Sequence, residues 1–139
     1  MIEGNLYIKL VKEYFAFLTT EFSYELSEQE IRGNFYYAVR YKDNTKMVSI
    51  SYENIEDYFQ VIVFILQNGK VPNYDDKTKT LHLNKLNAEV IFKVDKLEIN
   101  LNNDYFLKFQ ANDEFERKLL KSAKELRICL KHFSELRFC

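Results

Sequence analysis

The amino-acid sequence predicts an α+β fold: a four-stranded antiparallel meander with N- and C-terminal amphipathic helices packed on it. Two observations lead to this fold class. Apolar and polar residues alternate along residues 35–52, whereas apolar residues recur at helical spacing near both ends of the chain. With 139 residues, three glycines and one proline, the chain has the length of one domain and little material for a flexible linker. We therefore predict a single α+β domain over residues 1–139.

The sequence predicts a hairpin between strands at residues 34–42 and 46–53. An antiparallel register that faces Tyr41 with Val48 and Val39 with Ile50 places seven apolar side chains on one side of the sheet. These residues are Phe35, Tyr37, Val39, Tyr41, Val48, Ile50 and Tyr52. A short polar turn separates the two strands.

Two further strands, at residues 22–31 and 57–66, complete the predicted meander. In the first, apolar and polar residues alternate, although residues 27–30 also match a helix-capping box, which we interpret as a turn. The second is ambiguous. Helical spacing fits residues 55–66, but the many β-branched residues favour a central strand, and we predict a strand.

The two terminal helices carry the expected apolar stripes. Residues 5–18 present a wide apolar arc, which indicates burial against a sheet. Near the other end, Asp113 and Glu116 have the spacing of a helix N-cap box. The helix that follows has an apolar stripe on one side and basic residues on the other.

The segments between the fourth strand and the last helix are less regular. Residues 67–80 read as a polar loop, and residues 81–93 as a short helix. Residues 97–107 look like a second small hairpin with its turn at Asn102 and Asn103.

Cysteine usage and hydropathy bear on the cellular compartment. Cys129 and Cys139 would lie ~15 Å apart on a continuous helix, which is too far for a disulfide. A reducing, cytoplasmic location is the simplest interpretation. No apolar run approaches the roughly 20 residues of a membrane span, so we expect no membrane partner.

Residues with catalytic or metal-binding chemistry are sparse. Cys129 and His132 share a helix face, but two ligands do not make a zinc site, and three glycines cannot build a phosphate-binding loop. Asp75 and Asp76 precede a lysine, as in metal-dependent nuclease cores, yet all three fall within one predicted loop. We therefore predict no catalytic residue, no metal site and no cofactor, and expect that the protein is not an enzyme.

The first candidate binding surface is a patch of Tyr36, Glu53, Glu56 and Asp57. Tyr36 has the opposite parity to the core residues of its strand, so it should point away from the core. The three acids lie at the turn between the third and fourth strands. Tyrosine is enriched at protein interfaces, and acids suit a basic partner.

The second candidate surface is the basic face of the last helix: Arg117, Lys121, Lys124 and Lys131. From Arg117 onward the chain has seven basic and two acidic residues, and such a face could follow nucleic-acid phosphates. Surface helices also keep lysines simply for solvation, and the pI near 6.2 weakens the nucleic-acid interpretation.

Within residues 34–66, the sequences FYYAVRY, VSISYE and YFQV follow one another as strands. This pattern resembles the meander of many small bacterial α+β proteins, some of which are immunity proteins of toxin–immunity systems. The resemblance implies a small inhibitor whose partner is another protein, such as a toxin. It contains no motif residues, so it assigns no functional position.

Together these observations favour a small protein-binding module of the immunity-inhibitor type. The alternative is a nucleic-acid-binding protein that uses the basic face of the C-terminal helix. A second alternative is a small-ligand-binding protein.

Overall fold

The structure, a computed structural model, describes residues 2–136. It divides into two compact units, which we describe separately: a sheet unit that ends at His82 and a helical unit that begins at Leu83. A single domain over the whole chain stays a prediction. Cys139, invoked above for the disulfide argument, lies outside the described residues.

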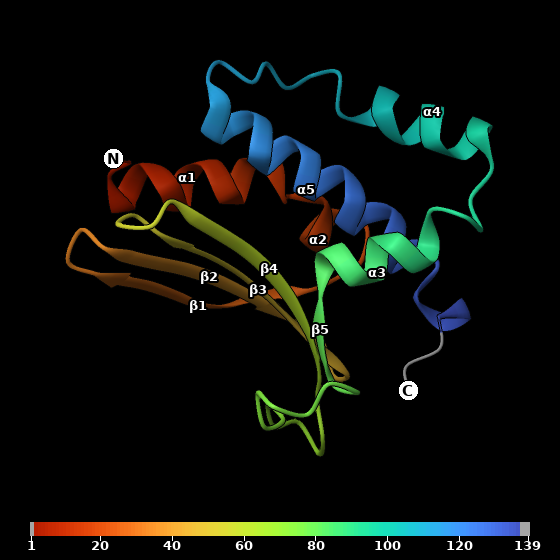
Figure 1. Ribbon diagram of the computed structural model, residues 1–139, viewed down its shortest axis with the longest axis horizontal. Helices are drawn as coiled ribbons and strands as arrows, with labels where there is room; N and C mark the ends of the chain where they lie inside the picture. Colours follow the sequence, from red (N-terminus) through yellow and green to blue (C-terminus); the bar gives the residue numbers. More distant parts are fainter. Residues whose placement is uncertain (1, 137–139) are drawn as a thin grey trace. The chain divides into compact units, whose positions relative to one another are not determined.

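The sheet unit contains two helices followed by an antiparallel sheet with strand order β1-β2-β3-β4-β5 (Figure 1). Its elements are α1 (Gly4–Tyr14), α2 (Phe17–Thr20), β1 (Glu25–Arg32), β2 (Tyr36–Lys42), β3 (Lys46–Glu53), β4 (Tyr58–Ile65) and β5 (Thr80–His82). The α+β class and the meander are confirmed, but the prediction of four strands is wrong. The short β5 pairs with β4 through Leu81 and Val63, and three residues are too few to show a strand period in the sequence.

The predicted hairpin register is confirmed. Tyr41 faces Val48 and Val39 faces Ile50, and six of the seven predicted core residues are buried. The exception is Phe35, which precedes β2 and is 45% exposed. Helix α1 lies over this face of the sheet, and Tyr7 stacks against Tyr52 with 6.0 Å between ring centroids.

The prediction of a strand rather than a helix at residues 58–66 is confirmed by β4. The interpretation of residues 27–30 as a turn is wrong, because these residues lie within β1. The pairing of β1 with β2 has a bulge between Leu26 and Glu28, and there the Ser27 hydroxyl donates to the Arg40 carbonyl at 3.1 Å. Strand pairing thus supplies the hydrogen bonds that a capping box would provide in a helix.

The helix predicted over residues 5–18 is divided in two. Helix α1 ends at Tyr14, and α2 begins at Phe17. The break allows both Phe15 and Phe17 to be buried, with their ring centroids 6.0 Å apart. A continuous helix would place these neighbours about 200° apart, so the break serves packing.

The helical unit consists of three helices and a short 3₁₀ turn. They are α3 (Leu83–Val90), α4 (Lys96–Tyr105), α5 (Glu114–Lys131) and η1 (Phe133–Glu135). Both α3 and α4 contact α5 (Figure 1). The predicted N-cap of α5 is confirmed: the Asp113 carboxylate accepts from the Glu116 amide at 2.8 Å. The packing of this helix on the sheet stays a prediction.

The second hairpin predicted at residues 97–107 is wrong, because α4 occupies this segment. Asp95 caps the helix by accepting from the Glu98 amide at 2.9 Å. Leu97, Ile99 and Leu101 alternate like a strand, but Leu97 and Leu101 are also one helical turn apart. The local cap decides between the two patterns. Within residues 2–136, no helix combines the length and the apolar character needed to cross a bilayer.

Candidate binding face of the sheet

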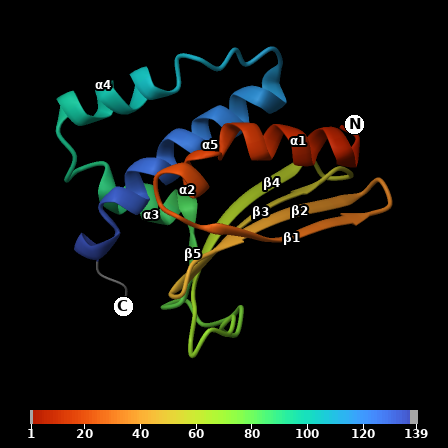
Figure 2. The same cartoon turned by 180° about the vertical axis from the view of Figure 1, so that it is seen from behind.

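The sheet has two faces of different character. One packs under α1, and the other, which we call the open face, carries the side chains of the opposite parity on β2, β3 and β4. In both Figure 1 and Figure 2, α1 lies on one side of these strands and the loop after β4 on the other. Cross-strand partners on the open face include Arg40 with Ser49 and Ser51 with Gln60.

A hollow of about 360 Å³ occupies the centre of the open face. Its lining residues are Glu28, Tyr36, Arg40, Met47, Ser49, Ser51, Gln60, Ile62, Phe64, Val71 and Tyr74. Ser49 and Ser51 lie on the central strand β3, while the flanking strands carry the longer Tyr36, Arg40 and Phe64. Short side chains between long ones form the hollow, so it follows directly from the sequence on three strands.

The loop of residues 66–79 contributes one wall of the hollow through Val71 and Tyr74. Several hydrogen bonds fasten this loop to the sheet. The Ile65 amide donates to the Lys79 carbonyl at 2.8 Å, and the Thr80 hydroxyl donates to the Asn73 carbonyl at 3.3 Å. The Tyr74 ring also meets His82 edge-on, 6.1 Å between centroids.

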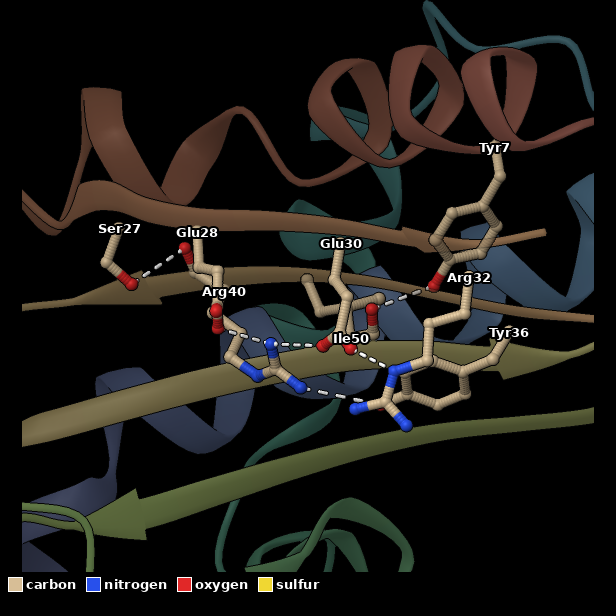
Figure 3. Close-up of polar contacts among 8 residues, drawn as sticks. All are labelled: Tyr7, Ser27, Glu28, Glu30, Arg32, Tyr36, Arg40 and Ile50. Carbon is tan, nitrogen blue, oxygen red and sulfur yellow. Dashed lines mark hydrogen bonds and ion pairs between the residues drawn. The ribbon is translucent and has the colours of Figure 1, made fainter.

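Ion pairs between β1 and β2 build the polar rim (Figure 3). Arg40 donates through Nη1 to Glu28 and, at 3.0 Å, to Glu30, and through Nη2 to the Tyr36 hydroxyl at 3.4 Å. Arg32 also donates to Glu30, and its guanidinium lies over the Tyr36 ring, 5.0 Å from the centroid. Both arginines thus contact Tyr36, and glutamates of β1 accept hydrogen bonds from both arginines.

The contacts within this rim favour the ionised forms of Glu30 and Arg40. Partial burial opposes ionisation of Glu30, but hydrogen bonds from Arg40 and Arg32 outweigh it and lower the pKa of Glu30. Burial likewise opposes the charge of Arg40, and its two glutamates outweigh that effect and raise the pKa of Arg40. Glu30 and Arg40 therefore stay ionised near neutral pH and are paired with each other.

The hollow has a polar and an apolar end. Glu28, Tyr36 and Arg40 of β1 and β2 line the polar end, whereas Ile62 and Phe64 of β4 line the apolar end. Val71 and Tyr74 extend the apolar end. Such a surface suits an occupant with an apolar group next to hydrogen-bonding groups.

The structure brings together only part of the predicted acidic patch. Tyr36 and Glu53 are cross-strand partners on the open face, and Glu56 is exposed in the turn beyond them. Asp57 instead accepts a hydrogen bond of 2.5 Å from Tyr52, whose ring belongs to the face under α1. Burial and the Asp57 carboxylate together raise the pKa of Tyr52 to about 12.

The basic face of α5 is only partly available. Arg117, Lys121 and Lys131 are exposed, whereas Lys124 is half-buried. The intervening Arg127 is buried, and its guanidinium lies 4.0 Å from the centre of the Tyr105 ring. The four predicted residues share one helix face, but the buried Arg127 does not belong to that face.

The other candidates for chemistry have structural partners. Cys129 is buried, which raises the pKa of its thiol to about 12, and the nearby Glu125 adds to this effect. His132 bonds to Glu98 and Glu135. The Asp76 carboxylate accepts from the amide and hydroxyl of Thr78 within one turn. In the described part of the chain, no three His, Cys, Asp or Glu side chains are grouped to hold a metal ion.

Sequence reasoning missed most residues of the hollow, although one signal could have found them. Arg40, Met47 and Phe64 follow from the same parity argument that placed Tyr36 on the outer face. Val71 and Tyr74 carry no such signal, because a loop has no repeating pattern.

No known protein family, curated protein or solved structure matches this chain.

Proposed function

We propose that this protein is a protein-binding module whose partner docks on the open face of the sheet. One observation carries the proposal: the hollow lies between Tyr36, Arg40 and Phe64 on a face opposite α1. Aromatic residues, arginine and methionine are enriched at the centres of protein interfaces, and energetic hot spots occupy such pockets. The partner would insert a side chain with an apolar body and a polar tip.

In this proposal the module acts as an inhibitor of the immunity type, in the cytoplasm, and its partner is a protein such as a toxin. An inhibitor needs only a complementary surface, whereas an enzyme needs a reactive group and a base or metal to activate it. The resemblance of residues 34–66 to small bacterial immunity proteins supports the same interpretation.

Charge reversal within the predicted acidic patch tests the docking surface. Glu53 lies on the open face beside Tyr36, whereas Glu56 lies in the turn beyond it. Glu53→Lys should therefore weaken capture of a protein from the native host, and Glu56→Lys should leave capture unchanged. Equal capture by both variants and the unchanged chain would contradict the proposed surface.

A small-ligand-binding function is the second candidate, and the volume of the hollow supports it. Ligand pockets usually span roughly 300–1,000 Å³ and bury most of their ligand. At about 360 Å³ the hollow is near the lower limit. Ligand-observed NMR with a fragment library tests this candidate. Fragments that bind the unchanged chain but no longer bind the Ser51→Trp variant would favour a ligand site over a protein interface.

Nucleic-acid binding through α5 predicts different behaviour. Affinity for a nucleic acid should fall steeply with salt and depend on Arg117, Lys121 and Lys131. Retention of nucleic acid by the purified chain, lost on reversal of these charges, would replace the open-face proposal.

A further inference from the structure

Helix α4 buries a polar side chain and exposes apolar ones. The residue that it buries is Asn102, which is 3% exposed, while Leu97 and Leu101 are 68% and 58% exposed. Asn102 donates to the Lys124 carbonyl at 3.0 Å and accepts from the Arg127 guanidinium at 2.8 Å. A surface helix ordinarily buries its apolar stripe and exposes its polar residues. The leucines of α4 therefore remain available to a further contact.

A row of charges runs beside the leucines. At 100° per residue, Lys96, Asn100 and Asp104 form an i, i+4, i+8 row next to the row of Leu97 and Leu101, and all five are exposed. Lys96 is the first residue of α4, and Asp104 lies in its last turn. The helix dipole favours the opposite arrangement, with acids at the start and bases at the end. These two charges thus do not stabilise their own helix.

The charges of the row of Lys96, Asn100 and Asp104 are complementary to those of a second copy that runs in the opposite direction. In two antiparallel copies related by a two-fold axis at Asn100, each Lys96 faces the Asp104 of the other copy. In the same arrangement Leu97 of one copy lies two residues along the helix, about 3 Å, from the level of Leu101 of the other. A parallel arrangement would instead place lysine against lysine and aspartate against aspartate, which is repulsive.

We propose that α4 is a self-association surface that pairs antiparallel with α4 of a second copy of this chain. The two leucine rows form the apolar centre, and two Lys96–Asp104 ion pairs flank it. A two-fold axis gives such an isologous interface, which is the commonest arrangement among homodimers. The charge order selects the antiparallel orientation.

The contact is small, which sets its expected strength. A ten-residue helix is ~15 Å long, and stable interfaces bury roughly 1,600 Å² in total. Phe92 and Leu107, 90% and 75% exposed, lie just beyond the two ends of α4 and can extend the contact. We expect a weak dimer, with Kd on the order of 100 μM.

Sedimentation equilibrium of the full chain up to millimolar concentration measures this dimer. Lys96→Glu places two acids opposite one another twice per dimer and should raise Kd about tenfold. The double variant Lys96→Glu with Asp104→Lys restores opposite charges across the axis and should return Kd to the original range. Both changes suit the helix dipole, so neither should unfold α4.

Two controls keep the experiment decisive. Lys85→Glu reverses an exposed charge on α3 and should leave Kd unchanged. Leu97→Gln with Leu101→Gln should abolish the dimer, with an unchanged far-ultraviolet circular dichroism spectrum. A chain that stays monomeric at millimolar concentration overturns the proposal. So does a dimer that is indifferent to Lys96→Glu, or a double charge swap that fails to restore it.

Discussion

Tyr7 of α1 donates a hydrogen bond of 2.8 Å to the carbonyl oxygen of Ile50, in the middle of the central strand β3 (Figure 3). Both residues are fully buried. Burial is also the main reason that the pKa of Tyr7 is raised well above its usual value, with the nearby Tyr36 and Tyr52 adding to it. This bond fixes α1 over one face of the sheet and so leaves the open face as the other.

Tyr7→Phe should lower the free energy of unfolding by about 1–2 kcal/mol, because it removes a hydrogen bond to a buried carbonyl without changing the packing volume. Tyr58→Phe is the matched control. Tyr58 is 54% exposed and donates to Gln60 at the surface, so its loss should be near neutral. Urea unfolding measures both variants, and equal losses would contradict the assigned position of Tyr7.

Ile50→Ala should cost about 2–5 kcal/mol, as expected for a large-to-small substitution in a core. The adjacent Ser49 points to the open face, where it lines the hollow, so Ser49→Ala should change stability by less than about 0.5 kcal/mol. Thermal or urea unfolding of the pair tests which side of β3 faces the core. A larger loss for Ser49→Ala would invert the assignment of the two faces.

Asn102→Ala should destabilise the chain by about 2–4 kcal/mol. The substitution removes the buried amide that accepts from the Arg127 guanidinium and donates to the Lys124 carbonyl, and the loss of a hydrogen bond to a buried charged group is costly. The neighbouring Asn103 is exposed, and Asn103→Ala should be nearly neutral. Similar urea midpoints for the two variants would argue against the polar contact between α4 and α5.

The contact of His132 with Glu98 and Glu135 makes stability depend on pH. Partial burial of the imidazole opposes protonation, but the two carboxylates outweigh it and raise the pKa of His132 above the ordinary value near 6.5. A raised pKa in the folded state means that this stabilisation is complete below pH 6.5 and is lost as pH rises through the folded-state pKa.

The difference in unfolding free energy between the unchanged chain and His132→Gln should therefore shrink as pH rises through the neutral range. An NMR titration gives the folded-state pKa of His132 directly. A value at or below 6.5 would refute this account of the contact.

How much of this structure could be predicted from sequence depends on the range of the interactions that determine each part. The alternation of Tyr37, Val39 and Tyr41 determines the hairpin register, because a slip by one residue would turn every side chain to the wrong face. The same register makes Tyr36 and Glu53 cross-strand partners, although the sequence analysis assigned Glu53 to the turn after the third strand. Local repeats therefore sufficed for the centre of the sheet.

Predictions failed where a few hydrogen bonds outweigh the pattern. The cap from Asp95 makes residues 96–105 helical despite an alternating sequence. The Asp57 carboxylate accepts a hydrogen bond from Tyr52, a contact that no sequence pattern records. Val71 and Tyr74 reach the hollow only because the loop folds back on the sheet, which no local repeat records.

The most direct test of the proposed function is to fill the hollow. Ser51 lies on its floor, so Ser51→Trp occupies the space that the partner would use. Lys9→Trp introduces the same residue at an exposed position of α1. With a partner protein captured from the native host, isothermal titration calorimetry should show affinity reduced by about 100-fold or more for Ser51→Trp, the loss expected when an interface hot spot is blocked. Lys9→Trp should bind like the unchanged chain. Unchanged affinity of a folded Ser51→Trp variant would contradict docking on the open face.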